Sequence, residues 1–301
     1  GGYGIYAYGC TITLGWTNPT DFIHANSYYI DYSNSNITLS QAFIDEDGNL
    51  YSGTVARVNG TYAINGKTLY PYIEGSVPYI DENGERQLCL QGNYTLLEGT
   101  ETSLGTSGQE TWYVADGMLD YSQTLTLSGD VHLILKDNAV MNVTSTSGHG
   151  INGSNHSISI YAQSMGDSKG QLHVNANVGV TSGIFAQDGN VNICGGEVVA
   201  TALYGITASA TTSTSNSGFI TISNATVTAT GENTGIYGVN ITINSGTVTA
   251  NGSYGLCVYG NGLNINGGQV TANGSTYGIY AILGNITLGW TNASDFIYAN
   301  S

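Results

Sequence analysis

Short stretches of alternating apolar and polar residues recur through the second half of the chain. Period-two alternation is typical of a strand with one buried face. The apolar spacing of three and four residues that marks a helix is absent, and β-branched residues dominate. The markers of the recurrence are Val191-Asn-Ile, Ile220-Thr-Ile, Ile241-Thr-Ile, Leu263-Asn-Ile and Ile286-Thr-Leu. The last four markers are 21, 22 and 23 residues apart, which predicts a repeating unit of strands.

Each repeat has two further strand segments after its marker. The second segment reads Val-Thr-Ala at residues 227–229, 248–250 and 270–272. The third follows the pattern x-Gly-Ile-Tyr-Ala, as at residues 277–281. We therefore predict an all-β fold, a parallel β-helix (solenoid) with about three short strands in each coil of 21–23 residues. Ile, Val, Leu and Ala should point inward and Thr outward, and each coil should advance about 4.8 Å along the axis.

The two ends of the chain repeat each other. Residues 3–27 return as residues 277–301 at a constant offset of 274 residues, including the shared sequence Ile-Thr-Leu-Gly-Trp-Thr-Asn. Against the coil pattern, both copies contain a first-segment and a second-segment strand. We expect residues 1–27 to be a β-helix coil equivalent to 275–301 on a single β-helix. They would form the end of a preceding unit in a longer tandem array.

Residues 28–111 interrupt the regular pattern. They contain two of the three prolines and three of the five Lys and Arg residues. Two related turns, Asp-Glu-Asp-Gly-Asn at residues 45–49 and Asp-Glu-Asn-Gly-Glu at residues 81–85, each follow a short apolar strand and predict β-hairpins. We expect irregular β coils or a small β insertion in residues 28–111. Residues 112–301 should form the parallel β-helix, with longer coils at its beginning.

The same two turns present carboxylates. Asp45, Asp47 and Asp81 are candidate ligands for Ca²⁺, a hard ion that takes about 6–8 oxygen ligands. A complete loop with a distal bidentate Glu is not evident, so solvated turns without metal are the favoured alternative. We therefore predict no cofactor, with calcium as the alternative.

The composition limits the classes of function. Charged residues make up 9% of the chain, against about 25% in ordinary globular domains. The formal net charge of −16 argues against nucleic-acid binding, which needs a basic surface. No apolar run approaches the roughly 20 residues of a transmembrane helix. Four cysteines without CxxC or metal spacing predict free thiols: Cys10, Cys89, Cys194 and Cys257.

An outward aromatic column is the candidate binding site. Phe185, Tyr237 and Tyr280 occupy the same third-segment position, with Thr207 and Cys257 in the remaining coils. In the duplicated end, Tyr6 corresponds to Tyr280. Stacked rungs would place these side chains about 4.8 Å apart. Flat rings beside Asn and Thr suit sugar stacking, whereas the alternative is a ladder that only stabilises the sheet.

Enzymatic activity is the third possibility. Gly148-His149-Gly150 is similar to the Gly-His-Gly of polygalacturonases, although His149 also occupies the place of a recurring Tyr. Glycoside hydrolysis needs two facing carboxylates, and no matching Asp pair lies on the regular coils. A pectate lyase needs a basic residue beside a calcium-binding carboxylate cluster, and only Lys136 and Lys169 follow residue 112. We predict no catalytic residues.

Three stretches carry a resemblance to a known family: residues 284–297, residues 45–53, and residues 94–101 before Trp112-Tyr-Val. They resemble large repetitive surface proteins of anaerobic Gram-negative bacteria, commonly described as carbohydrate-binding-domain-containing or pectin-lyase-like. The resemblance spans most of the chain. It implies a right-handed parallel β-helix and an exported, cell-surface location.

These patterns predict a structural repeat unit of an extracellular fibre, stalk or adhesin shaft. The expected partners are neighbouring copies of the same repeat, joined head-to-tail. The alternative is a glycan-binding adhesin that uses the aromatic column on host or matrix glycans. A polysaccharide-active enzyme is the third and least favoured function.

Overall fold

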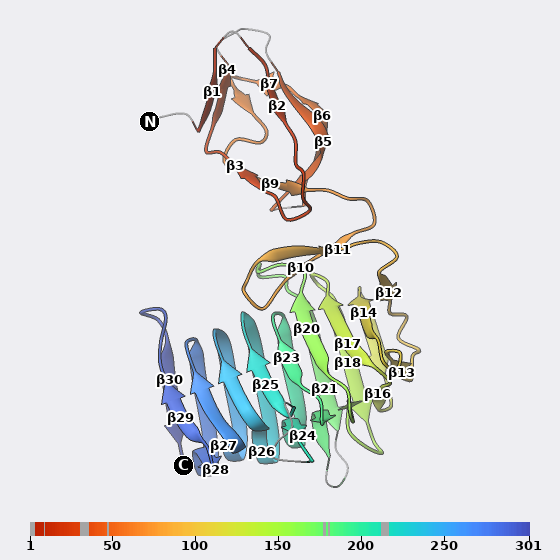
Figure 1. The fold of residues 1–301 in the computed structure, drawn as a ribbon, viewed down its shortest axis with the longest axis vertical. Coiled ribbons are helices and arrows are strands. Elements are labelled where there is room, and N and C mark those ends of the chain that lie inside the picture. Colours follow the sequence, from red (N-terminus) through yellow and green to blue (C-terminus); the bar gives the residue numbers. More distant parts are fainter. Residues whose placement is uncertain are drawn as a thin grey trace. The chain divides into compact units, whose positions relative to one another are not determined.

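The structure, a computed structural model, describes residues 4–8, 10–30, 36–46, 48–176, 179, 181–211 and 217–301. All regular elements within these ranges are β-strands (Figure 1). The chain forms two compact units. The N-terminal unit comprises Gly1–Val77 and Gln87–Gln91, and the solenoid unit comprises Pro78–Arg86 and Gly92–Ser301.

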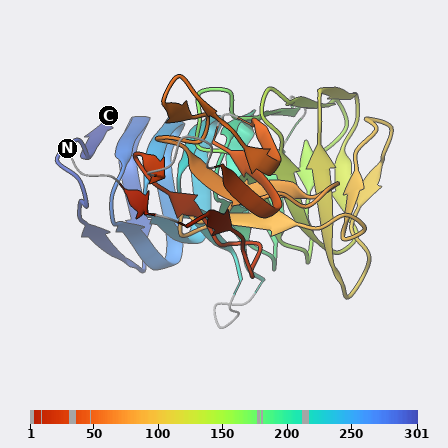
Figure 2. The same cartoon turned by 90° about the horizontal axis from the view of Figure 1, so that it is seen from above.

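The solenoid unit is one 19-stranded sheet wound into coils, and its successive coils follow one another in chain order (Figure 2). Its strands are β12 (Tyr94–Leu96), β13 (Ser103–Leu104), β14 (Glu110–Ala115), β15 (Met118–Tyr121), β16 (Leu125–Leu127), β17 (Asp130–Leu135), β18 (Val140–Ser145), β19 (Ile151–Asn152), β20 (Ile158–Ala162), β21 (Gln171–Ala176), β22 (Ser182–Gln187), β23 (Val191–Ile193), β24 (Glu197–Ser209), β25 (Phe219–Ile222), β26 (Ala225–Ile243), β27 (Gly246–Ile265), β28 (Gln269–Ile282), β29 (Asn285–Leu288) and β30 (Phe296–Asn300). The pairings recorded between them are parallel, so the predicted parallel β-helix is confirmed.

The predicted first-segment markers lie directly above one another on what we call the first face. Ile220 pairs with Ile241, Ile241 with Leu263, and Leu263 with Ile286. The second face stacks the Val-Thr-Ala segments, with Val248 against Val270. The third face stacks the Gly-Ile-Tyr segments. In the last coils the three segments run together into the long strands β26, β27 and β28.

Coil length changes along the solenoid. First-face steps of 18, 20, 27, 33 and 29 residues precede the regular steps of 21, 22 and 23. The expected longer early coils are therefore present. The solenoid also begins earlier than the expected residue 112, because β12 and β13 already pair with β14 and β16. Its eight first-face steps span about 38 Å, since each rung advances about 4.8 Å.

The core follows the predicted alternation. Val227, Ala229, Ile241 and Ile243 are at most 1% exposed, and the intervening Thr228 is half-buried. Amide side chains form ladders at the ends of the segments, as expected. Asn266 Nδ2 donates to Asn244 Oδ1 at 2.9 Å, and Asn273 Nδ2 donates to Asn251 Oδ1 at the same distance. Each ladder satisfies polar groups from one coil to the next.

A glycine ladder allows the third face to bend. Gly183, Gly205, Gly235 and Gly255 each precede the inward Ile or Leu of this face. A Cβ built on Gly205 would lie 2.6 Å from the carbonyl oxygen of Gly235, and one on Gly235 would lie 2.8 Å from that of Gly255. Both contacts are with backbone of the next coil, which cannot move without disturbing the rung.

We predict that Gly235→Ala lowers the free energy of unfolding of the solenoid unit by about 1–3 kcal/mol, because the methyl group overpacks the coil interface. Gly289→Ala is the matched control, since its Cβ would meet nothing nearer than 3.5 Å. Urea denaturation of both variants measures the difference. Equal stability of the two variants would contradict the close approach.

The N-terminal unit begins as a solenoid and then changes topology. Its strands are β1 (Ile5–Ala7), β2 (Ile12–Leu14), β3 (Ile23–His24), β4 (Tyr28–Ile30), β5 (Ile37–Asp45), β6 (Leu50–Val55), β7 (Arg57–Val58), β8 (Thr61–Tyr62) and β9 (Thr68–Pro71); β10 (Val77–Ile80) and β11 (Arg86–Cys89) follow at the boundary of the units. β4 and β5 pair parallel with β1 and β2, one coil further along. β6 and β9 are antiparallel to β5, and β9 is antiparallel to β3.

This antiparallel sheet shows that residues 28–77 leave the helical path, so the two duplicated ends lie in different units rather than on one continuous β-helix. The insertion of antiparallel strands agrees with the β insertion expected in this region, although it ends before residue 94. The predicted hairpin after Asp45 is present, with β5 and β6 paired across it.

The duplicated sequence nevertheless takes the same local structure in both places. Asp21 Oδ2 accepts the backbone N–H groups of Thr17 and Asn18, each at 2.9 Å. Asp295 Oδ2 accepts those of Thr291 and Asn292 at 2.7 and 2.8 Å. These backbone donors, Asn18 and Asn292 foremost, lower the pKa of both carboxyl groups.

Candidate ligand-binding groove

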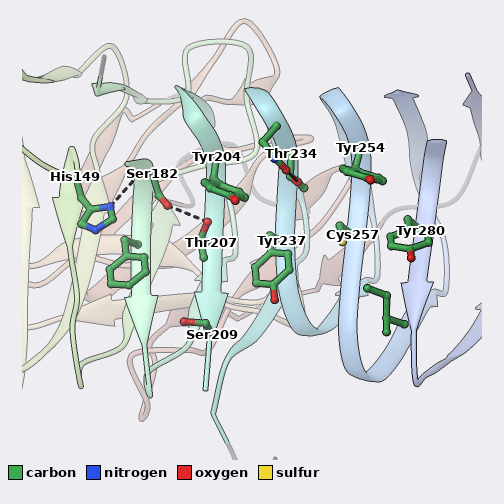
Figure 3. A pocket seen from close by; sticks show the side chains of 13 residues that line it. His149, Ser182, Tyr204, Thr207, Ser209, Thr234, Tyr237, Tyr254, Cys257 and Tyr280 are labelled. Atoms are coloured by element: carbon green, nitrogen blue, oxygen red, sulfur yellow. Dashed lines mark hydrogen bonds between the residues drawn. The ribbon is translucent and has the colours of Figure 1, made fainter. Parts of the chain in front are cut away.

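The third face of the solenoid unit carries a groove of about 560 Å³ (Figure 3). This volume is within the range of small-molecule sites. The groove is lined by His149, Ser182, Phe185, Tyr204, Thr207, Ser209, Asn233, Thr234, Tyr237, Tyr254, Cys257, Tyr280 and Ile282. These side chains come from the segment before β19 and from β22, β24, β26, β27 and β28.

Two columns of side chains form the lining. The inner column is the predicted one, and the register aligns Phe185 with Thr207, Tyr237, Cys257 and Tyr280. The outer column lies three residues earlier in each coil and aligns Ser182 with Tyr204, Thr234, Tyr254 and Tyr277. Both columns face outward because the Gly-Ile pair between them turns the chain, with Ile in the core.

The two columns alternate in size from coil to coil. A coil with an aromatic residue in one column has a small residue in the other, as for Tyr204 beside Thr207 and Tyr254 beside Cys257. The small residues are buried, with Thr207 and Cys257 each 6% exposed. They form the floor of the groove, and the rings form its ridges.

The ring contacts in the described part of this face fall into three clusters. His149 stacks on Phe185 at 4.1 Å with an interplanar angle of 4°. Tyr204 meets Tyr237 edge-on at 6.2 Å. Tyr280 stacks on both Tyr254 and Tyr277, at 5.2 and 5.4 Å. The inner-column members of successive clusters are two rungs apart, or about 9.6 Å along the axis.

Hydrogen bonds fix the floor of the groove. Ser182 Oγ donates to Thr207 Oγ1 at 2.9 Å, and the Ser182 backbone N–H donates to His149 Nδ1 at 2.9 Å. The neutral His149 ring therefore has its proton on Nε2. Burial lowers the pKa of His149. The lining contains no Asp, Glu, Lys or Arg, so the groove presents hydroxyls, amides and rings rather than charge.

The structure brings three of the four predicted glycan-binding residues to one site: Phe185, Tyr237 and Tyr280. Tyr6 lies in the N-terminal unit, where its ring stacks on Tyr29 at 5.6 Å. The sequence reasoning missed Tyr204, Tyr254 and Tyr277 of the outer column. Their signal was the variable first position of the x-Gly-Ile-Tyr pattern, which three of the coils fill with Tyr.

The candidate calcium ligands are occupied by protein donors where they are described. Asp45 is 4% exposed, unlike the solvated turn that was favoured. It accepts Asn49 N–H at 2.8 Å and the Tyr51 hydroxyl at 2.9 Å. Asp81 Oδ1 accepts backbone N–H groups across its own turn. Asp47 lies outside the described residues, and the described residues contain no group of three His, Cys, Asp or Glu side chains placed to hold a metal.

All four cysteines are free thiols, as predicted. Burial raises the pKa of Cys257 in the groove floor to about 11. The thiol is therefore protonated at neutral pH and contributes shape rather than reactivity.

Comparison with known families supports the fold. The Beta helix repeat family matches residues 241–262 and 263–282, each of which is one coil starting at a first-face strand. No curated protein and no solved structure matches the chain. The fold and this match define a parallel β-helix protein of repeat type, with a structural or binding role. Among the described residues, no helix is long and apolar enough to span a membrane.

We predict that the stability of the solenoid unit falls as the pH decreases below about 6.5, in part through His149. The lowered pKa means that the unfolded chain binds this proton first, so the contribution is complete above the unfolded pKa and is lost below it. His149→Phe keeps a ring against Phe185 but removes the titration. Urea denaturation at several pH values should show a shallower pH dependence for the variant. His132, whose pKa burial also lowers, remains in both proteins and cancels in the comparison. Identical pH dependence of both proteins would contradict the prediction.

Proposed function

We propose that the chain is a structural repeat unit of an extracellular fibre, stalk or adhesin shaft on a bacterial surface. The single observation that carries this is the duplicated sequence, whose two copies, 274 residues apart, form the same Asp-centred turn. A sequence that takes one structure at both ends of a 274-residue period is suited to join consecutive units. The partners are further copies of the unit, arranged head-to-tail.

The solenoid architecture supports this role. Each coil contacts only its neighbours, so length can grow by adding coils without enlarging a core. The weakly charged surface rich in Thr, Asn and Tyr suits an exported protein, as the resemblance to bacterial surface proteins also implies.

The test is a series of chains with one, two and three units, joined so that Ser301 is followed by a copy of residues 28–301. Negative-stain microscopy should show particles that lengthen in equal steps of no less than about 38 Å, the solenoid length. Particles that do not lengthen with added units would overturn the shaft. A chain in which the appended units are a flexible linker of equal length is the control.

A second candidate function, glycan binding, is favoured by the groove. Three aromatic clusters separated by small residues offer an extended ligand a series of apolar steps, with hydroxyls and amides between them. Since the lining has no charged side chain, the fitting class is a neutral oligosaccharide that lies along the solenoid axis. The rings that stack on each other also stabilise the sheet, so the ladder and the binding role are compatible.

We predict that Tyr237→Ala weakens binding to a neutral oligosaccharide by at least about tenfold. Cys257→Tyr should also abolish binding, because it fills the floor between the second and third clusters. Tyr298→Ala is the control, since Tyr298 is 53% exposed on the second face. A glycan array identifies the ligand, and calorimetry measures affinities. Absence of any glycan binding, or equal affinity in all variants, would contradict this function.

The groove favours binding over cleavage. Hydrolysis of a glycosidic bond needs a pair of carboxyl groups at the bond, and the lining supplies none. His149 stacks against Phe185 and accepts a backbone hydrogen bond, which accounts for its position without catalysis. Release of reducing ends from polysaccharides that is lost in His149→Ala would establish an enzyme instead.

A further inference from the structure

The last coil of the solenoid unit exposes apolar side chains on a strand edge. Ile286, Leu288 and Trp290 are 46%, 53% and 79% exposed, and Phe296 is 48% exposed. Among the described strands, β29 pairs only with β27 and β30 only with β28. Such an edge offers unpaired backbone groups beside an apolar surface, which proteins normally cover.

The N-terminal unit shows how the same sequence is covered. The first-copy residues Ile12 and Leu14, which correspond to Ile286 and Leu288, are 9% and 7% exposed. Their strand β2 pairs in parallel with β5, with Ile12 opposite Ile37 and Leu14 opposite Leu39. β5 therefore occupies the edge that is open on β29.

The tryptophan of the repeat is also held in the first copy. Trp16 Nε1 donates to the carbonyl oxygen of Ala42 at 3.1 Å, and Trp16 N–H donates to Gln41 Oε1 at 2.9 Å. Both partners follow β5 without a break or lie in it. The corresponding Trp290 is the most exposed ring of the last coil.

The third-face segment of the first copy is covered as well. Tyr6, the counterpart of Tyr280, lies opposite Tyr29 in β4, and the two rings stack with an interplanar angle of 5°. A continued coil would therefore extend the aromatic ladder by one more ring.

An antiparallel strand then closes the coil. β9 pairs with β5 on one side and with β3 on the other, so the sheet order β2-β5-β9-β3 links the first and second segments of one coil across its end. Phe43, Ile64 and Leu69 are fully buried beneath this sheet. Antiparallel closure stops further parallel stacking, which is what a solenoid needs at its end.

We propose that residues 28–77 are a capping module for a coil with the duplicated sequence, and that the last coil, residues 277–300, is the docking edge for a second copy of this module. This inference rests on the proposed tandem arrangement, in which the duplicated sequence precedes another copy of residues 28–77. The module recognises its coil through the Ile-x-Leu strand pairing, the tryptophan hydrogen bonds and the tyrosine stack.

The experiment appends a copy of residues 28–77 directly after Ser301, which reproduces the Ser27–Tyr28 junction. Hydrogen exchange followed by mass spectrometry should show the amides of residues 285–300 exchanging at least about tenfold more slowly than in the unextended chain. The matched control has Ile37→Asp and Phe43→Asp in the appended copy only, and its last coil should exchange as in the unextended chain.

A second variant guards against misfolding of the extension. Trp290→Ala in the extended chain removes the anchoring ring from the edge and should partly reverse the protection, while the N-terminal unit keeps its own exchange pattern. Equal exchange of residues 285–300 with and without the extension would overturn the capping module. That outcome is distinct from failure of the shaft, because multi-unit chains can lengthen in microscopy without this protection, and protection can occur in chains that form no shaft.

Discussion

The in-register parallel pairing of successive coils is the constraint on which the solenoid depends. Each residue lies against its counterpart about 4.8 Å away, so a side chain that packs well in one coil must also pack against itself. The inward Ile, Val and Ala positions satisfy this by repetition. The glycine column satisfies it by absence, since the approach of Gly235 to the Gly255 carbonyl leaves no room for a Cβ. The groove depends on the same register, because only aligned coils bring Phe185, Tyr237 and Tyr280 into one column.

The regular part of the fold was predictable because its information is local and repeated. The Ile-x-Ile markers give both the strand and its register, so the stacking of Ile220, Ile241, Leu263 and Ile286 followed from spacing alone. The inner aromatic column followed in the same way. The outer column did not, because period-two alternation places residues three apart on opposite faces, and the Gly-Ile bend that reverses this rule is a feature of the folded coil.

The N-terminal unit was less predictable because its contacts join segments with no common pattern. Leu69 pairs with Ile23, and Phe43 with Pro71, across stretches that carry no repeat signal. The start of the solenoid was missed for a related reason. β12 is short and its Leu96 is 52% exposed, so alternation does not reveal it, and only its pairing with β14 places it in the sheet.

The in-register stacking has a further consequence for charge. A carboxylate repeated at one position would face its own copies at rung distance, and like charges directly opposite each other destabilise a sheet. Hydroxyl, amide and phenol groups can instead donate to and accept from identical neighbours. In the described pairings from β21 onward, Glu197 is the single carboxylate, and Gln171 and Thr226 flank it. The scarcity of charge in this chain is thus a consequence of self-stacking geometry as well as of habitat, and a charged variant would be tolerated at one rung more readily than at two consecutive ones.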